Sequence, residues 1–429
     1  MTNDDVIKAA FRVWGQELYK TTSLSKLAGI LGVSKPALYR HFPSKEALIA
    51  AMEERFYDDY ADALKPAVKE ARKNSGWQEK LLTIARFIAG YFARHFDYYI
   101  YCLVKLHDGK VHNINNIDAM RERGVSFKEL GLNVMADHPS VLFLAGVTSL
   151  FGTGMFHKRR HKGRYSTMPR ELDASWFLEQ PSEEEITRFI NAIAERIRLG
   201  LRFDEALVNS LPYEELEHRI FSEEKPQDSV LKDDLTLTPL DPFLKAAAEA
   251  VAEEGPWNAS MQKVAARSGL SKSGLYAHFK SKEDMLSRLF MTEFDRIAQY
   301  AALCTVTAKT REEQLYLVII SLTKYLQARP EIPVLLDWIR IQRLQLDLSV
   351  PTVLYNFFIG LKIEVSEEVV WEDVSQWILF LLVAVFMHAH AVSNGDLIST
   401  SLCQRPEGLD YAGLRKVFRF ISLGIKGLE

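Results

Sequence analysis

The stretch TSLSKLAGILGVSKPALYRHFPSKEAL at residues 22–48 occurs a second time, as ASMQKVAARSGLSKSGLYAHFKSKEDM at residues 259–285. The two stretches align without a gap at a shift of 237 residues, and about half of their positions are identical. Self-similarity on this scale indicates two copies of one structural unit in a single chain. The fold and the domain organisation therefore depend on what this unit forms.

Each stretch has the pattern of two short helices joined by a tight turn. Ser23 and Ser34 are N-cap residues for the two helices of the first copy, and Pro36 fits the first turn of the second helix. Gly32 permits the positive φ that the turn between them needs. This is the layout of a helix-turn-helix. The inward positions of the first copy are Leu24, Leu27, Ala28, Leu31, Val33, Leu38 and Phe42. In the second copy the corresponding caps are Ser260 and Ser271, the turn glycine is Gly269, and the corresponding inward positions are Leu270, Leu275 and Phe279.

The outward-facing residues of the second helix are those expected to touch DNA. Lys35 and Lys272 lie at its N-terminal end, where recognition helices meet base edges, while nearby tyrosines and histidines can donate to phosphates. The Ser-Lys pairs that follow would start the next helix as a phosphate clamp. A core role for the tyrosines, with solvated lysines, is the alternative. The predicted DNA-binding residues are Ser34, Lys35, Pro36, Ala37, Tyr39, Arg40, His41 and Lys45, and Ser271, Lys272, Ser273, Gly274, Tyr276, His278 and Lys282.

Charge supports a local rather than a global attraction to nucleic acid. The chain has 53 Lys and Arg against 56 Asp and Glu, a net charge of -3. Residues 20–45 and 258–282 nevertheless each contain five basic residues and no acidic one. Any DNA binding must therefore come from these two basic segments.

The motif Gly, Val or Leu, Ser, Lys, two variable residues, Leu, Tyr, one variable residue, His, Phe, and then Ser, Lys, Glu resembles the DNA-binding signature of the TetR (tetracycline-repressor-like) family. The resemblance covers about 45 residues of each half. It implies, for each copy, a three-helix DNA-binding bundle followed by a helical ligand-binding and dimerisation domain. It also implies a transcriptional regulator, more commonly a repressor, that a small molecule releases from DNA.

Helical periodicity fills most of the remaining sequence. Runs such as EKLLTIARFIAGYFARHF have apolar residues at helical spacing, and alternating strand patterns are scarce. We therefore expect an all-α protein made of two tandem TetR-like domains. The expected boundaries are 1–48 for the first helix-turn-helix domain, 49–222 for the first C-terminal domain, 223–240 for a linker, 241–286 for the second helix-turn-helix domain and 287–429 for the second C-terminal domain.

Two copies in one chain predict an internal pseudo-dimer. Apolar residues 141–155 and 186–201 of the first half could pair with 374–391 and 414–425 of the second as a four-helix bundle, although each set also suits the core of its own half. Further homodimerisation is left open. The two recognition helices differ, KPALYR against KSGLYA, which predicts an asymmetric operator with half-sites ~34–36 Å apart.

A ligand site is suggested only by aromatic density. Residues 91–107, YFARHFDYYIYCLVKLH, suit an apolar or aromatic effector, and packing in the core explains the same stripe. An alternative within this fold is that one copy no longer binds DNA, so that only one recognition helix with its bundle, here called a reader, is active. The candidate ligand-binding residues are Tyr91, Phe92, Tyr98, Tyr99, Trp338 and Tyr355.

Other classes of site find little support. Cys102, Cys304 and Cys403 form no metal or disulfide pattern, and His388 and His390 are two apart on an expected helix, which suits core or surface better than a metal site. The basic run at 157–164 reads as a solvated loop. No catalytic motif appears, so an enzyme is disfavoured, and neither a cofactor nor a metal is expected. The N-terminus lacks a leader pattern and no apolar run spans a bilayer, so we expect a cytoplasmic protein without membrane contact.

Overall fold

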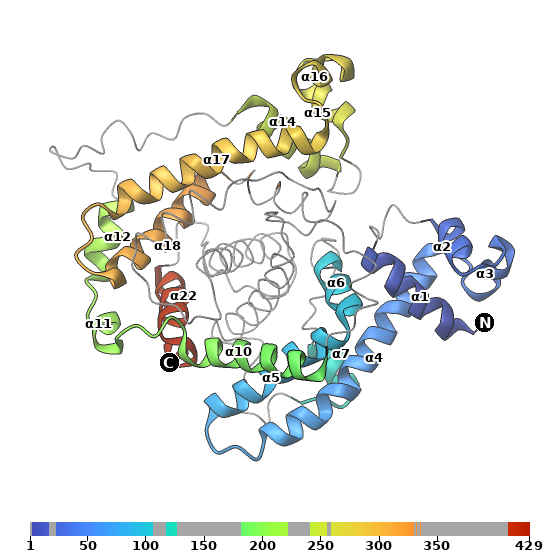
Figure 1. Cartoon of the computed structure of the whole chain (residues 1–429), viewed down its shortest axis with the longest axis horizontal. Coiled ribbons are helices and arrows are strands. Elements are labelled where there is room, and N and C mark those ends of the chain that lie inside the picture. Colours follow the sequence, from blue (N-terminus) through green and yellow to red (C-terminus); the bar gives the residue numbers. More distant parts are fainter. Residues whose placement is uncertain are drawn as a thin grey trace. The chain divides into compact units, whose positions relative to one another are not determined.

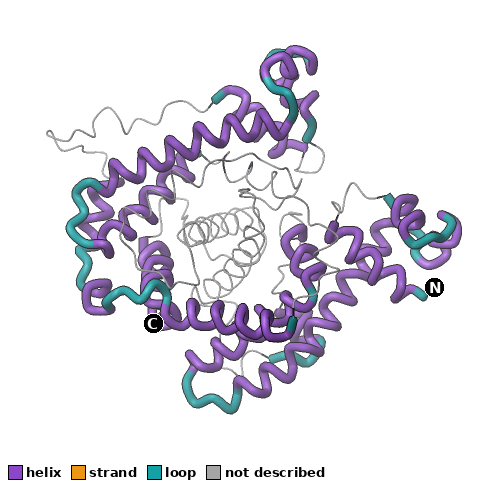
Figure 2. The backbone as a smooth tube through the Cα atoms, viewed as in Figure 1, coloured by secondary structure: helices purple, strands orange, loops and turns teal. Residues whose placement is uncertain are grey.

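The fold is helical throughout the part of the chain that can be described. The computed structural model describes residues 2–16, 23–105, 117–126, 182–221, 241–254, 259–329, 332, 335 and 411–429. Within these ranges every regular element is a helix and none is a strand (Figure 2), which confirms the all-α class. None of these helices is long and apolar enough to cross a membrane. Outside the described residues lie the segments 141–155, 157–164 and 374–391, and also Trp338, Tyr355, His388, His390 and Cys403.

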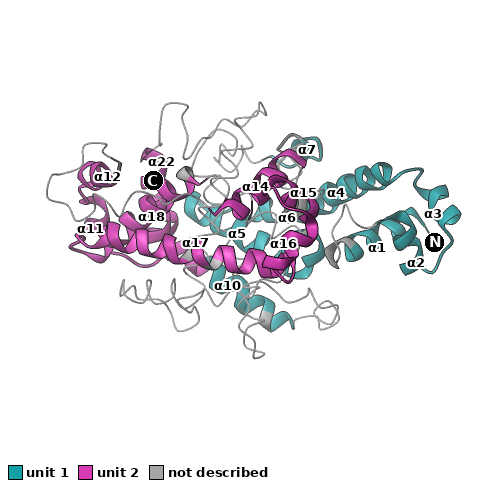
Figure 3. Cartoon of the chain, turned by 90° about the horizontal axis from the view of Figure 1, so that it is seen from above, with its two compact units in different colours: residues 1–135, 170–194, 341–343 teal, residues 136–169, 195–340, 344–429 magenta. Residues whose placement is uncertain are grey.

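The described residues divide into two compact units, which Figure 3 colours separately. Unit 1 contains the described residues up to Ala194 and unit 2 those from Glu195 onwards. Unit 2 thus includes residues 195–221, which precede the expected linker. The domain boundaries expected from the sequence remain predictions.

Unit 1 is built around a long helix with the N-terminal helices at one end. Burial of apolar side chains holds it together: Phe11 of the first helix and Phe56 of the long helix are almost completely buried. Its helices are α1 (Asn3–Gln16), α2 (Leu24–Ile30), α3 (Lys35–His41), α4 (Lys45–Ala71), α5 (Trp77–Arg94), α6 (Phe96–Lys105), α7 (Ile117–Glu122) and the greater part of α10 (Glu183–Leu199).

Unit 2 repeats this plan and adds two short helices from the first copy. As Figure 1 shows, α15 and α16 lie at the N-terminal end of the long helix α17. The helices of unit 2 are α11 (Glu205–Asn209), α12 (Tyr213–Phe221), α14 (Pro242–Glu254), α15 (Met261–Arg267), α16 (Lys272–His278), α17 (Lys282–Thr305), α18 (Arg311–Ala328), α22 (Tyr411–Leu423) and the 3₁₀ helix η2 (Gly424–Leu428).

The repeat extends beyond the motif into the helices that follow it. Helices α5 and α18 are both 18 residues long. Their C-caps have nearly the same backbone conformation, with φ and ψ of -124° and 60° at His95 and of -135° and 60° at Arg329. The two helices can therefore be compared position by position.

The C-terminal turns of the two copies meet inside unit 2. Gly200 and Gly424, which follow α10 and α22, have φ values of 57° and 64°. The Leu201 amide donates to the Ile421 carbonyl at 2.9 Å, and the Phe203 amide donates to the Ser422 carbonyl at 3.2 Å. A Cβ atom on either glycine would overlap the backbone of the other turn. Equivalent turns of the two copies therefore pack directly on each other through glycine.

Candidate nucleic-acid interface

The turn between the two short helices has the same geometry in both copies. Gly32 and Gly269 have φ values of 66° and 70°, and a Cβ atom at either would meet nothing within 4 Å. Glycine is thus required by backbone conformation rather than by space. Amides of the next residues, Val33 and Leu270, each donate to a carbonyl of the preceding helix at 2.9 Å. These two side chains are half-buried, so they plug the core less completely than expected.

Serine caps fix both recognition helices, α3 and α16. The Ser34 hydroxyl accepts from the Ala37 amide at 3.3 Å, and the Ser271 hydroxyl accepts from the Gly274 amide at 3.0 Å. Buried Leu38 and its counterpart Leu275 hold the helices against the bundle. The expected caps at Ser34 and Ser271 are therefore present.

The caps of the preceding helices differ between the copies. Ser23 accepts from the Lys26 amide at 3.2 Å, as expected for an N-cap. Ser260 occupies the N-cap position of α15, but its side chain accepts no capping hydrogen bond. The second copy therefore lacks one of the side-chain caps that stabilise the first.

The outer faces of α3 and α16 carry the predicted contact residues. Tyr39 and Tyr276 are 39% and 40% exposed, so neither ring belongs to the core. The Lys35 ammonium lies 5.7 Å from the Tyr39 ring centroid and that of Lys272 lies 6.0 Å from Tyr276, a cation–π arrangement in both. Of the other predicted residues, Ser34, Pro36, Arg40, Ser271, Ser273 and His278 are exposed, and Ala37, His41, Lys45, Gly274 and Lys282 are half-buried.

The residues that follow the recognition helices form a matched pair of caps with one difference. Ser44 caps α4 by accepting from the Ala47 amide at 3.1 Å, and Ser281 caps α17 by accepting from the Asp284 amide at 3.1 Å. The Asp284 carboxylate also accepts from the Lys280 amide at 2.8 Å, and this contact holds the pKa of Asp284 below its ordinary value. Arg288, one turn further along α17, donates to the same carboxylate at 2.9 Å, so a carboxylate–guanidinium pair lies at the start of α17 where the first copy has Ala47 and Ala51.

Sequence reasoning missed Asp284, although a signal for it was present. Ser281 and Asp284 have the serine-x-x-acid spacing of a capping box. Lys282, the predicted clamp residue beside them, is half-buried like Lys45, and burial lowers the pKa of Lys282; the difference between the two sites is the Asp284 carboxylate, which occupies the Lys280 amide. The start of α17 is therefore a poorer environment for a phosphate than the start of α4.

The histidines that end the two recognition helices have different neighbours. The His41 Nδ1 atom lies 2.7 Å from the Asn3 side-chain oxygen of α1, a hydrogen bond within the bundle. His278 instead contacts the Phe243 ring of α14, with centroids 5.6 Å apart. Asn3 was not among the predicted residues, because nothing in the motif links α1 to the end of α3.

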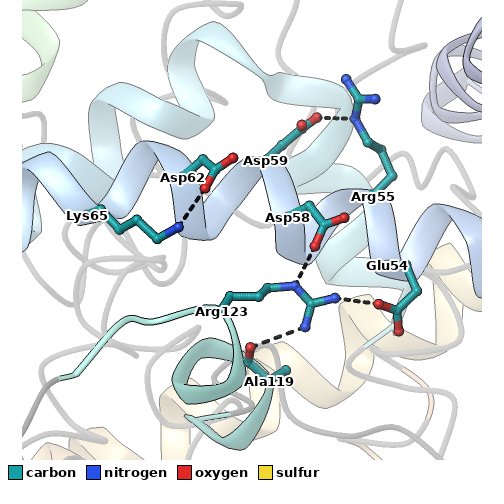
Figure 4. Close-up of polar contacts among 8 residues, drawn as sticks. All are labelled: Glu54, Arg55, Asp58, Asp59, Asp62, Lys65, Ala119 and Arg123. Carbon is teal, nitrogen blue, oxygen red and sulfur yellow. Dashed lines mark hydrogen bonds and ion pairs between the residues drawn. The ribbon is translucent and has the colours of Figure 1, made fainter.

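Helix α4, which follows the first recognition helix, is held on its flank by α7 and by Arg123, the residue directly after α7. Figure 4 shows Arg123 between two acidic residues of α4: its guanidinium donates to Asp58 at 2.7 Å and to Glu54. On the same helix Arg55 donates to Asp59 at 2.8 Å and also reaches Asp4 of α1. These contacts neutralise acidic side chains of α4 and tie α1 and α7 to it.

The aromatic residues proposed to bind a ligand pack on one another in unit 1. Ring centroids lie 5.7 Å apart for Tyr91 and Phe92, and 5.5 Å apart for Phe92 and Tyr99. Phe11 of α1 contacts Tyr98 of α6 at 4.5 Å, and the Tyr98 hydroxyl donates to Asp59. Burial is the main cause that raises the pKa of Tyr98, so the hydroxyl stays protonated. The cluster therefore joins the first helix of the reader bundle to α4 and α6.

Comparison with known proteins agrees with this geometry. A family model described as "Bacterial regulatory proteins, tetR family" matches residues 6–52 and 243–289, once in each copy. The uncharacterized HTH-type transcriptional regulator YuxN of Bacillus subtilis (strain 168) is 40% identical over 53 residues, which are 12% of this chain and 18% of that protein. The match thus spans less than one fifth of the relative's length.

A solved structure, described as the fatty acid degradation regulator FadR from Bacillus halodurans, has 20% sequence identity and a TM-score of 0.32. The alignment covers 43% of this chain and 96% of that one. The assignment rests on the two family-model matches, each of which includes both short helices and the capped turn between them. Each half of the chain therefore carries the DNA-binding domain of the TetR family of bacterial regulatory proteins.

Proposed function

We propose that the chain is a cytoplasmic transcriptional repressor that places two unequal readers on one asymmetric operator and releases it when a small molecule binds. The observation that carries this proposal is the pair of recognition helices. Their turns and caps agree, whereas their outward residues differ: Pro36 and Arg40 in α3 stand where Ser273 and Ala277 stand in α16. Equal scaffolds with different outer faces favour two different half-sites.

The first reader is proposed to contribute more affinity than the second. Arg40 adds a cation on the exposed face of α3, and its counterpart Ala277 adds none. Asp284, which is paired with Arg288, places a carboxylate in the first turn of α17 and occupies the Lys280 amide, whereas its counterpart Ala47 does neither. Both differences weaken phosphate contacts in the second copy. They also favour the second candidate function, a regulator in which α16 is idle.

An internal pseudo-dimer is proposed as the scaffold for the two readers. The packing of Gly200 on Gly424 supports it, because equivalent turns of the two copies meet there. TetR-like regulators generally act as twofold dimers, and a contact between equivalent elements is what a twofold relation requires. A second copy of the whole chain is then not needed to bring two readers together.

The effector is proposed to act through the aromatic cluster of unit 1. Phe11 belongs to α1 of the reader bundle and contacts Tyr98 and Tyr101 of α6, with centroids 4.5 Å and 5.1 Å apart. A ligand that parts these rings would therefore move α1 against α6. Binding would shift the population between DNA-competent and incompetent arrangements. An apolar or aromatic ligand suits this lining.

Selection of bound sequences from random duplex DNA, with purified protein at stated salt, tests the proposal. We expect one enriched site with two dissimilar arms about one helical turn apart. A perfect palindrome protected equally on both arms would contradict the asymmetric operator. A single enriched arm would favour the one-reader candidate, and failure to enrich any sequence would contradict DNA-binding regulation as a whole.

A further inference from the structure

Helices α11 and α12, residues 204–221, belong to the first copy in sequence but pack on helices of the second copy within unit 2. The key contact is Glu217, which is 6% exposed. Its carboxylate accepts two hydrogen bonds from the Arg415 guanidinium of α22, at 2.7 Å and 2.6 Å, and a third from the Tyr316 hydroxyl of α18. One side chain of α12 thus joins two helices of the second copy.

Aromatic packing surrounds this ion pair. The Tyr213 ring lies 4.9 Å from the Tyr316 ring and 6.2 Å from the Phe418 ring. Tyr316 and Phe418 are completely buried. Burial of Tyr213 raises its pKa to about 12, so its hydroxyl is neutral at physiological pH. Three rings and one carboxylate therefore form a single closed cluster between α12, α18 and α22.

Further contacts hold both ends of the segment. The Lys324 ammonium of α18 donates to the Ile220 carbonyl in the last turn of α12, where the orphan carbonyls of a helix attract a cation. At the other end, Arg419 of α22 donates to the Asn209 side chain of α11. The segment is therefore bound along its length and not only through Glu217.

The first copy lacks the residues that form this docking surface. On the helix pair α5 and α18, Tyr316 and Lys324 correspond to Leu82 and Gly90. Gly90 instead lets Ile190 of α10 approach α5 directly. With Gly200 aligned on Gly424, the remaining two docking residues, Arg415 and Phe418, correspond to Asn191 and Ala194. The surface is therefore specific to the second copy.

We propose that residues 204–221 are an intramolecular latch that pins α18 to α22 and holds the helical domain of the second copy in one arrangement. Since α18 packs along α17, which begins at the second reader, a closed latch fixes the setting of that reader. Effector-driven movement is then confined to the first copy. This consequence for DNA rests on the proposed function, whereas the latch itself does not.

Hydrogen exchange on the full chain tests the latch without DNA. Arg415→Met leaves a buried carboxylate without its cation, and we expect amides of α12 and α18 to exchange about tenfold faster or more. Glu217→Gln/Arg415→Met removes both charges and keeps an oxygen acceptor for the buried Tyr316 hydroxyl, so exchange should return to within about threefold of the wild-type rates. Glu205→Gln is the matched control, because its ion pair with Lys426 is exposed.

Three outcomes would overturn the latch. One is unchanged exchange in α12 of Arg415→Met, and another is faster exchange in α12 while α18 keeps its wild-type rates. The third is a double variant that exchanges as fast as the single one. For DNA, Arg415→Met should weaken the half-site read by α16 about threefold and leave the other unchanged. An equal loss of affinity at both half-sites would contradict the claim that the latch fixes the setting of the second reader. Binding of the wild type to the selected operator tests the proposed function separately.

Discussion

The two copies have closely similar turns and recognition helices, where contact with DNA is expected, and different residues in the interior behind them. Their turn glycines have φ values of 66° and 70°, and both recognition helices run for seven residues from a capping serine. Behind the readers, Phe56 of the first copy corresponds to Glu293 of the second, which is 1% exposed and accepts a hydrogen bond from Tyr325. Backbone geometry has thus been kept while side-chain chemistry diverged.

A duplicated reader must keep the backbone features on which contact with a DNA groove depends. A positive-φ turn and a capped helix are needed for any groove contact, so they persist in both copies. The interior needs only to be filled and to have its polar groups hydrogen-bonded. Packed aromatic rings meet this need in the first copy, and a buried carboxylate that accepts a hydrogen bond from a tyrosine meets it in the second.

The largest effect is expected at the contact between the equivalent turns of Gly200 and Gly424. Gly200→Ala places a Cβ atom against the backbone of the Gly424 turn at a positive φ, which we expect to cost about 3 to 5 kcal/mol of unfolding free energy. Gly29→Ala is the control: it lies inside α2 with nothing within 4 Å, and should stabilise by about 0.5 to 1 kcal/mol. Chemical denaturation measures the unfolding free energy of both variants. Equal effects of the two substitutions would show that the contact between the glycine turns does not contribute to stability.

The next effect concerns the readers themselves. Lys35→Ala/Tyr39→Ala should weaken operator binding about 10- to 100-fold, because it removes a cation and an exposed ring from α3. Lys272→Ala/Tyr276→Ala should weaken it about 3- to 10-fold, since the second reader contributes less. Fluorescence anisotropy at two salt concentrations measures affinity and the salt slope together. A larger loss from the second pair would invert the proposed ranking.

A smaller, opposite pair of effects is expected at the helix starts. Asp284→Ala removes the carboxylate from the start of α17, frees the Lys280 amide and releases Arg288 from its ion pair, so it should raise operator affinity about threefold. Ala47→Asp adds the same charge to α4 and should lower affinity by a similar factor. Both are read in the same anisotropy assay at low salt. If neither substitution alters the affinity, the start of these helices does not face phosphate.

The smallest effect is expected at a buried thiol of the second copy. Burial raises the pKa of Cys304 to about 12, and Tyr300 is hydrogen-bonded to it. A folded-state pKa above the unfolded value means that stability is complete below about pH 9 and falls as the pH rises towards 12. Near pH 8 we expect no labelling of Cys304 by iodoacetamide until the protein is denatured. Peptide mass spectrometry checks this, and ready labelling of native protein would show that the interior of the second copy opens easily.

Much of the reader could be predicted from sequence because its determinants are local. Caps such as Ser34 and the glycine turn at Gly32 follow from the conformations that single residues favour, and the structure has them as expected. The internal repeat also predicted the tandem helical architecture. Ser260 was wrongly assigned a capping bond, since a serine at an N-cap position does not have to orient its hydroxyl towards the helix.

The latch and the contact between the Gly200 and Gly424 turns could not be predicted in the same way. Glu217 looks like one of several acidic residues on a short amphipathic helix, and only its contact with Arg415, far along the chain, sets it apart. Periodicity assigns a face to each helix but no partner. The ring cluster around Tyr98 was recognised by composition, yet composition does not distinguish core packing from a ligand site.

Scrambling one half-site of the operator at a time tests directly whether two similar readers have unequal roles. The selected operator is prepared with either half-site scrambled, and binding of the wild type and of the two double reader variants is measured at one salt concentration. We expect that scrambling the arm read by α3 lowers the affinity of the wild type more than scrambling the other arm. Each double variant should lose no further affinity when the arm read by its own substituted helix is scrambled, and should still lose affinity when the other arm is scrambled. Equal losses from both arms, with no pairing between variant and arm, would contradict this expectation.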